Sequence, residues 1–409
     1  MLSKFIDTMK IRILILLTAT WMIFHSTSSC AQWNKQQLNI DFYSDSIEIP
    51  VDHSLFIEFN KPLSDANIKD FYSSVNASQY VETVQSLLKY KQNHNLNDWF
   101  YYQLVRKVVQ QISPKDDNYY RYTLYKWFVM AKSGYDVHLA IGGQQLLFYI
   151  RSDENIYDIP FYVKNNKQYV CLNRHDYIKT DFEKLTVLEV EIAIAKAVNA
   201  FSYKISQLPD FKSNTYAEKD IHFDYHENAY EFKIKINPQL NTIFANYPVV
   251  DFDSYFNIPL SKETYSSLIL TLKSNLQGMS QKEGVEYLMD FTRYAFSYES
   301  DQDNYGKEKR LSPELTLLSD HSDCDDRVGL FFYLVKEIYN LPMITLLYPT
   351  HVTIAISFDK PVGKPIVYKG RKYSVCEPTP QYESLSIGQI SSELRKIPYQ
   401  VVYEYNPNK

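Results

Sequence analysis

Three observations predict an α+β fold. Segment 99–112 places its apolar residues on one face of a helix, at Leu104, Val105, Val108, Val109 and Ile112. Apolar and polar residues alternate in other segments, as they do in strands, notably in 38–42, 47–51 and 351–358. Segment 328–339 is apolar on nearly every side, which is typical of a buried helix. We therefore expect a C-terminal core in which this helix packs on an antiparallel sheet, preceded by an N-terminal α+β region.

The N-terminal half is expected to begin with strands and to continue with helices. The alternation in 32–55 predicts an edge or wrapping element, and the pattern becomes helical from about Ile68. A predicted helix over 120–132 ends at Ser133-Gly134, a typical C-terminal stop. Strand-like segments follow at 137–141, 146–150 and 168–172.

The middle of the chain gives weaker signals. Leu185 to Phe201 predicts a helix, and the alternation on either side of His226-Glu227-Asn228 predicts a hairpin. Segment 262–296 is helical with a break at Gly278, and the polar segment 297–313 predicts a surface loop. We expect an export signal over 1–31, an N-terminal region over 32–180, a connecting region over 181–262 and a C-terminal domain over 263–409.

The composition excludes several classes of protein. The chain has 409 residues, enough for two or three domains, and a formal charge of −5 without a long basic run, which argues against a nucleic-acid binder. Ten glycines make Gly-rich phosphate loops unexpected, and four cysteines are too few for a disulfide framework. The 36 tyrosines are an excess that the sequence does not explain.

The N-terminus resembles an export signal. Basic residues at positions 4, 10 and 12 precede an apolar stretch over 13–24, which is shorter than the about 20 residues that cross a membrane. Ser29 and Ala31 satisfy the small-x-small rule for cleavage. Alternatives are lipid attachment at Cys30, although Thr27 stands where an aliphatic residue is usual, and an uncleaved anchor.

The expected location is therefore extracytoplasmic, in the periplasm or at the cell surface, with membrane attachment through Cys30 as an option. No later apolar run approaches 18 residues. In an oxidising compartment Cys171 and Cys376 could form a disulfide, although nothing in the sequence requires one.

Three residues in the C-terminal domain form a candidate catalytic group. Cys324 begins the buried helix, where a helix N-terminus stabilises a thiolate, although the neighbouring aspartates oppose it. His351 begins an alternating strand on a face of small residues, so it can supply the imidazolium that the thiolate needs. Glu377 ends the strand-like segment 373–377, where its carboxylate could hold the second imidazole nitrogen.

Other residues offer competing roles. His321 is a rival base, but it lies too close along the chain to face the thiol easily, and Asp325 and Asp326 fit helix-start and loop-bracing roles. His222 and His226 are four residues apart in strand-like sequence without further ligands, so we expect a solvated hairpin and no metal site. The backbone N–H of Cys324 would serve an oxyanion hole, and Gln302 is a guess for its side-chain donor.

The motifs resemble the transglutaminase-like superfamily of papain-like cysteine enzymes. Ser322-Asp323-Cys324-Asp325-Asp326-Arg327 is similar to its cysteine motif, Tyr348-Pro349-Thr350-His351-Val352 to its histidine strand, and Cys376-Glu377-Pro378-Thr379 to its Asp-Pro-Thr motif. The three occur in the family's order, within about residues 280–380. The resemblance implies Cys324 as nucleophile, His351 as general base and acid, and Glu377 as orienting acid where the family usually has Asp.

The resemblance implies an exported cysteine peptidase, amidase or acyltransferase that attacks an amide carbonyl and forms a thioester. Because water is always present as an acceptor, we favour hydrolysis of a peptide or isopeptide, with cell-wall peptide as one candidate substrate. No metal or organic cofactor is implied. The alternatives are a non-catalytic binding or scaffold protein with the same fold, and a carbohydrate or lipid binder that uses exposed aromatic rows.

An internal copy is a further hypothesis. Shifting the chain by 205 residues aligns 160–172 with 365–377 without gaps, and the identical pairs include Cys171 with Cys376. The same shift places Tyr119, Leu146 and Leu172 at the three reactive positions, and none of them can perform the chemistry. Residues 98–178 are therefore interpreted as a decayed copy of 303–383.

Overall fold

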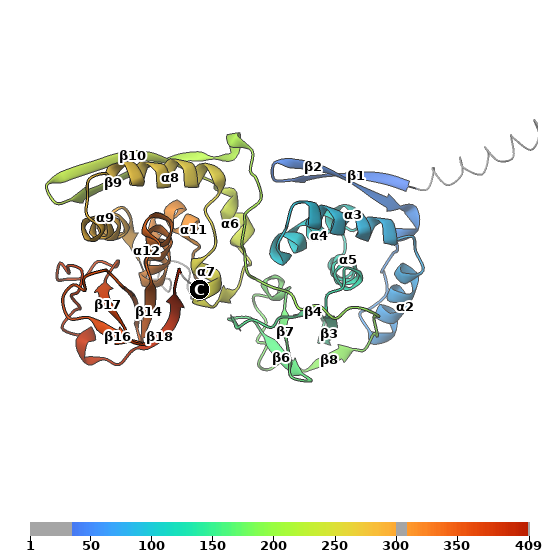
Figure 1. The fold of residues 1–409 in the computed structure, drawn as a ribbon. Helices are drawn as coiled ribbons and strands as arrows, with labels where there is room; N and C mark the ends of the chain where they lie inside the picture. Colours follow the sequence, from blue (N-terminus) through green and yellow to red (C-terminus); the bar gives the residue numbers. More distant parts are fainter. Residues whose placement is uncertain (1–34, 300–308, 408–409) are drawn as a thin grey trace, which may run out of the picture. The chain divides into compact units, whose positions relative to one another are not determined.

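The computed structural model describes residues 35–299 and 309–407, in two compact units. The first unit takes in residues up to Asn95 together with Tyr101–Ile150 and Lys179–Asn199. The second takes in Leu96–Phe100, Arg151–Ile178 and the chain from Ala200 onward. Helices and antiparallel strands occur in both (Figure 1), so the α+β class is confirmed. The expected domain limits stay predictions.

The first unit begins with a hairpin and continues with helices, as its sequence pattern predicts. Strands β1 (Lys35–Phe42) and β2 (Asp45–Asp52) pair in antiparallel register, with one buried face. Helices α2 (Asp65–Asn76), α3 (Val81–Asn93), α4 (Asp98–Ile112) and α5 (Tyr119–Lys132) follow. Strand β3 (Val137–Gly142) then pairs with both β4 (Gln145–Arg151) and β8 (Val187–Val190).

The helix predicted over 185–201 is wrong. The structure has only the strand β8 at Val187–Val190, without a helix in the rest of that segment. Val190 pairs with Leu139 of β3 and is buried, whereas Leu188 is exposed. Pairing with β3 satisfies the backbone of this segment, and tertiary context of this kind overrides the helical propensity of its Leu, Glu and Ala residues.

The second unit contains the predicted hairpin and helices. Strands β5 (Ile156–Tyr157) and β11 (Val249–Val250) pair, as do β6 (Phe161–Lys164) and β7 (Lys167–Cys171). Strands β9 (Ala217–Tyr225) and β10 (Asn228–Ile236) form the hairpin around His226. The helices that follow are α6 (Gln239–Phe244), α7 (Phe252–Phe256), α8 (Lys262–Asn275) and α9 (Gln281–Tyr294). Gly278, with a φ of +84°, lies in the turn between α8 and α9, at the break that the sequence predicts.

The C-terminal part of this unit contains the buried helix and its sheet. Strand β12 (Ser297–Tyr298) pairs in parallel with β13 (His321–Ser322), and α11 (Pro313–Leu318) precedes α12 (Cys324–Tyr339). The strand order of the sheet is β16 (Ile366–Tyr368), β17 (Arg371–Cys376), β15 (His351–Ile356), β14 (Met343–Tyr348) and β18 (Gln400–Tyr405), all antiparallel. Helix α12 contacts β15 on one side and α7, α8, α9 and α11 on others (Figure 1).

Tyrosine contributes much of the buried core. Tyr101, Tyr102, Tyr125, Tyr203, Tyr255, Tyr287 and Tyr373 are among the largest fully buried side chains. Many hydroxyls find polar partners inside, as when Tyr255 donates to the main-chain carbonyl of Asp325. A tyrosine buries a large apolar ring and still satisfies a buried acceptor, so the excess of tyrosine supplies core volume together with internal hydrogen bonds.

Some features of the C-terminal core recur 205 residues earlier. Helix α5 begins at Tyr119 after the capping residue Asn118, as α12 begins at Cys324 after the capping residue Asp323. Strand β3 pairs with β4 and β8, as β14 pairs with β15 and β18, and β6 pairs with β7 as β16 pairs with β17. A decayed copy would retain this pattern, and the duplication remains our interpretation.

Candidate active site

Cys324 is the first residue of α12, as the sequence predicts. The helix starts there because the side chain of Asp323, its N-cap, accepts a hydrogen bond from the amide of Asp326. The thiol is free and partly exposed, whereas the eleven residues from Asp325 to Val335 are all buried. The fold therefore holds this cysteine on a rigid helix with its side chain at the edge of the core.

His351 and Glu377 are in direct contact. The Nε2 atom of His351 lies 2.8 Å from Oε2 of Glu377. Only 12% of the histidine side chain and 2% of the glutamate side chain are exposed. The other carboxylate oxygen, Oε1, accepts a hydrogen bond of 3.0 Å from the amide of Thr379. Both oxygens of Glu377 are therefore engaged, and Nδ1 of His351 is the nitrogen left for a substrate or a thiol.

The histidine strand reaches the cysteine through its backbone. Helix α12 contacts β15, and the main-chain amide of Val352 interacts with the Cys324 thiol. Glu377 also lies within electrostatic reach of that thiol. The start of β15 therefore lies next to Cys324, and Glu377, which contacts His351, lies within electrostatic reach of the thiol.

The electrostatics of the thiol differ from the simplest expectation for a helix N-terminus. Burial, followed by the charges of Asp325 and Asp323, raises the pKa of the Cys324 thiol, and Glu377 adds to this rise. The amide of Val352 lowers the pKa, but the other effects outweigh it. These effects oppose a thiolate, so ionisation of Cys324 at neutral pH requires a base that takes its proton.

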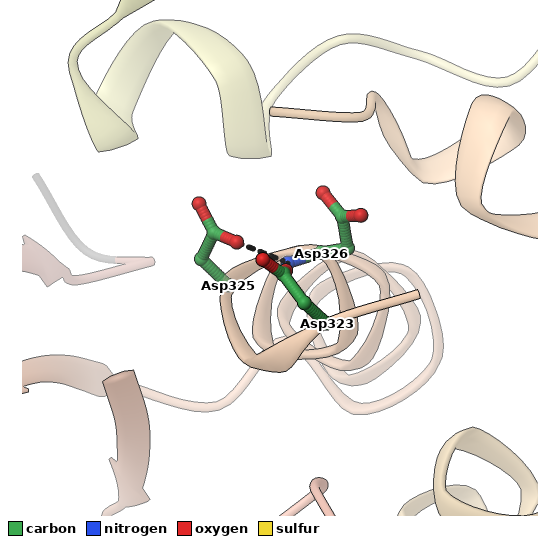
Figure 2. Close-up of side chains that lie close together, drawn as sticks. All are labelled: Asp323, Asp325 and Asp326. Atoms are coloured by element: carbon green, nitrogen blue, oxygen red, sulfur yellow. Dashed lines mark hydrogen bonds between the residues drawn. The ribbon is translucent and has the colours of Figure 1, made fainter. Parts of the chain in front are cut away.

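Three aspartates surround the start of α12, as Figure 2 shows. Oxygen atoms of Asp323, Asp325 and Asp326 lie within 4.8 Å of one another. Each carboxylate also has a donor from the protein. Asp323 accepts from the amide of Asp326, Asp325 lies 3.2 Å from Nε of Arg310, and Asp326 accepts from the amide of Leu311 at 2.7 Å. These contacts fit the bracing role predicted for Asp325 and Asp326.

Asp325 is buried beside Asp323 and faces the guanidinium of Arg310. Burial, followed by the hydrogen bond between its side chain and that of Asp323, raises the pKa of Asp325, whereas the guanidinium of Arg310 opposes that rise. Arg310 lies over the ring of Phe252 and donates to the carbonyl of Val250. The loop that precedes α11 is thus fastened to α7 and to the first turn of α12.

The rival residues make other contacts. Nδ1 of His321 is 3.4 Å from Glu299, on the partly exposed pair β12–β13. His222 is exposed and 3.4 Å from Glu231 on the partner strand of its hairpin. His226 lies in the turn of that hairpin, with a φ of 55°. Gln302, the guess for an oxyanion donor, lies outside the described residues.

Sequence reasoning missed several residues that build the site. Tyr298 on β12 has its pKa raised by burial and, next, by the charges of Cys324 and Asp323, so its ring lies within electrostatic reach of the thiol. Arg293, Arg310 and Arg327 join the elements around the site through hydrogen bonds to main-chain carbonyls. Of these three, only Arg327 belongs to a motif in the sequence. The other two could not be found, because every residue has a main-chain carbonyl and the residue types therefore do not show which one an arginine binds.

The described part of the chain bears on two further questions, whether Cys171 and Cys376 form a disulfide and whether a helix crosses a membrane. Neither Cys171 nor Cys376 forms a disulfide within the described residues, and both are completely buried. Among residues 35–299 and 309–407, no helix is long and apolar enough to cross a membrane. The predicted export signal, including Cys30, lies outside the described residues.

The chain matches no known family model, no curated protein and no solved structure. Its function therefore has to be inferred from the site itself.

Proposed function

We propose that this protein is an exported transglutaminase-like cysteine enzyme that acts on amide or peptide bonds through a thioester, with hydrolysis as its main reaction. The observation that carries the proposal is the buried pair of His351 and Glu377, whose Nε2 and Oε2 atoms are 2.8 Å apart. The residue after His351 on β15, Val352, contacts the Cys324 thiol through its main-chain amide. A nucleophile, a base and a group that orients the base are the parts that covalent acyl transfer requires.

The raised pKa of the Cys324 thiol determines how the first step proceeds. The thiol gives its proton to Nδ1 of His351 as sulfur attacks the carbonyl carbon, and Glu377 stabilises the imidazolium that forms. The tetrahedral intermediate collapses, the C–N bond breaks, and the leaving amine takes the proton from His351. Water then attacks the thioester with His351 as its base, which releases the acid and restores the thiol.

Charge that develops on the substrate oxygen needs donors. The amide of Cys324 is at the first position of α12, where a helix leaves amides without partners in the helix. We propose the hydroxyl of Tyr298 as the side-chain donor, in place of Gln302, because Tyr298 pairs with Ser322, two residues before Cys324, and lies within electrostatic reach of the thiol. No step of this scheme uses a metal or an organic cofactor.

A non-catalytic binding or scaffold protein is the second candidate. The observation that favours it is the environment of Cys324, where burial and the charges of Asp325 and Asp323 raise the pKa of the thiol and so oppose the thiolate. A decayed enzyme would keep the helix, the strand and the His351–Glu377 contact for stability alone.

Incubation of the purified protein with a panel of peptides, isopeptides and cell-wall peptides tests the proposal. We expect release of an amine that is lost in Cys324→Ala and reduced in Tyr298→Phe. Amine acceptors added to the same mixture distinguish hydrolysis from transfer. If no product forms and the mass of Cys324 never increases by an acyl group, the scaffold function is favoured.

A further inference from the structure

Two buried arginines link the cysteine helix to Glu377, which directly follows β17. Arg327 is three residues after Cys324 on α12, and Arg293 is in the last turn of α9. Arg327 is 0% exposed and Arg293 is 5% exposed. Neither residue takes part in the proposed chemistry, so their burial requires a separate explanation.

The guanidinium of Arg327 donates its hydrogen bonds to main-chain carbonyls and lies 5.9 Å from the centre of the Tyr298 ring. Its Nη1 atom donates to Thr292 at 3.0 Å and to Arg293 at 2.6 Å, and Nη2 donates to Phe296 at 2.9 Å. Its Nε atom is 3.4 Å from the carbonyl of Ser322, two residues before Cys324. Arg327 therefore joins the start of α12 to the C-terminal end of α9, where the helix leaves carbonyls without partners.

The guanidinium of Arg293 continues this connection to the other half of the site. Its Nε atom donates to the main-chain carbonyl of Glu377 at 2.6 Å, and Nη2 donates to that of Leu385 at 2.8 Å. Nη1 is 3.1 Å from Asp290 on the same helix. The main chain of Arg293 thus accepts from Arg327, while its side chain holds the residue whose carboxylate contacts His351.

Stability alone does not explain this arrangement. Burying a guanidinium is unfavourable unless its donors are satisfied, and apolar side chains of similar volume often serve a core equally well. Burial lowers the pKa of Arg327 to about 10, as expected for a guanidinium removed from water. An arginine presents several donors in a planar, rigid fork, so its length and directions fix the separation of the carbonyls it binds.

We propose that Arg293 and Arg327 are positioning residues, which act in series to set the separation between Cys324 on α12 and the His351–Glu377 pair on the sheet. This inference rests on the proposed function and concerns how its site is assembled. Small displacements matter in such a site, since an error of about 1 Å at the reacting atoms can lower a rate by about 100-fold.

The test is the rate at which iodoacetamide alkylates Cys324 between pH 5 and pH 10, read for each cysteine peptide by mass spectrometry. We compare the wild type with two variants. Arg293→Met removes every donor of the side chain, whereas Arg293→Lys keeps an ammonium group that can still reach one carbonyl. For Arg293→Met we expect about a 10- to 100-fold lower rate at pH 6, with reactivity returning only at alkaline pH, and for Arg293→Lys an intermediate loss.

Two controls separate positioning from unfolding. Cys376, next to Glu377, and Cys171 are fully buried, so their protection from alkylation shows that the fold persists in each variant. Arg121→Met removes an arginine of α5 that donates to Ser113 and pairs with Glu58, and we expect it to leave the Cys324 profile unchanged.

A profile of Arg293→Met that matches the wild type at pH 6, together with a lower melting temperature, would overturn the inference and leave a structural role only. If the wild type itself shows no alkylation that depends on His351, the proposed function fails first, and the positioning role fails with it. The two failures are distinguished by the wild-type profile.

Discussion

Replacing Glu377 by glutamine probes the acid of the candidate site without changing its size. In the structure, Oε2 of Glu377 binds Nε2 of His351 at 2.8 Å, and Oε1 accepts from the amide of Thr379 at 3.0 Å. A carboxylate serves both donors, but a glutamine side chain has only one acceptor oxygen. In Glu377→Gln, one of the two buried N–H groups must therefore face an NH₂ group.

The size of the effect follows from these contacts. A hydrogen bond to a charged group contributes about 1.5–3 kcal/mol, and about 1.4 kcal/mol corresponds to a factor of ten in rate. Since the pair is buried, solvent screens it little. We expect Glu377→Gln to lower the alkylation rate of Cys324 at pH 6 by about 10- to 100-fold, because the imidazolium loses its stabilising charge.

The assay is the pseudo-first-order rate of iodoacetamide labelling at the Cys324 peptide, with the melting temperature measured alongside. Glu337→Gln is the matched control, because Glu337 lies near the C-terminal end of α12, the helix that Cys324 begins, and its carboxylate accepts a hydrogen bond from the hydroxyl of Tyr265. An unchanged rate in Glu377→Gln, with an unchanged melting temperature, would refute the role of Glu377 as the residue that holds His351.

Three further predictions follow from the structure. Asp323→Asn keeps a good capping residue but removes a charge that raises the pKa of the Cys324 thiol. In a His351→Ala background we therefore expect Cys324 to ionise at lower pH. The pH–rate profile of alkylation measures this shift, and an unchanged profile would contradict it. Arg327→Met leaves several buried carbonyls without their donor, so we expect a loss of stability of about 3 kcal/mol or more in urea denaturation; a loss under about 1 kcal/mol would show that the carbonyls find other partners. Burial raises the pKa of Tyr125 and of Tyr287 to about 12 from an ordinary value of 10, so the folded chain binds these protons more tightly than the unfolded chain does. Their contribution to stability is complete below pH 10 and is lost as the pH rises to about 12, at a rate of about 1.4 kcal/mol for each group and pH unit. Urea titrations at pH 9 and pH 11 measure this loss, and Tyr287→Phe should reduce it.

Much of the fold could be predicted from hydrophobic spacing. The hairpin around His226, the break at Gly278 and the helix that begins at Cys324 all follow local rules, which a sequence displays directly. The segment 185–201 could not be predicted in this way, because pairing with β3 decides its conformation. Strand partners far along the chain do not appear in local periodicity.

The candidate site could also be predicted only in part. The order of the motifs predicted that Cys324, His351 and Glu377 belong to one site, and the structure contains the contact between His351 and Glu377. The pKa of the Cys324 thiol is raised mainly by burial, and local sequence indicates the burial of a single residue poorly. Arg293 was also beyond reach, since its partners Glu377 and Leu385 are 84 and 92 residues away and accept through main-chain carbonyls.

The measurement that tests the central claim most directly is the alkylation rate of Cys324 at pH 6, in the wild type and in His351→Ala. Because burial and two carboxylates raise the pKa of this thiol, an isolated Cys324 should be almost inert at that pH. We predict that the wild-type rate exceeds that of an exposed cysteine in a peptide and that His351→Ala abolishes the excess. A rate no faster than the peptide's, unchanged by His351→Ala, would contradict the claim that Cys324 is a catalytic nucleophile.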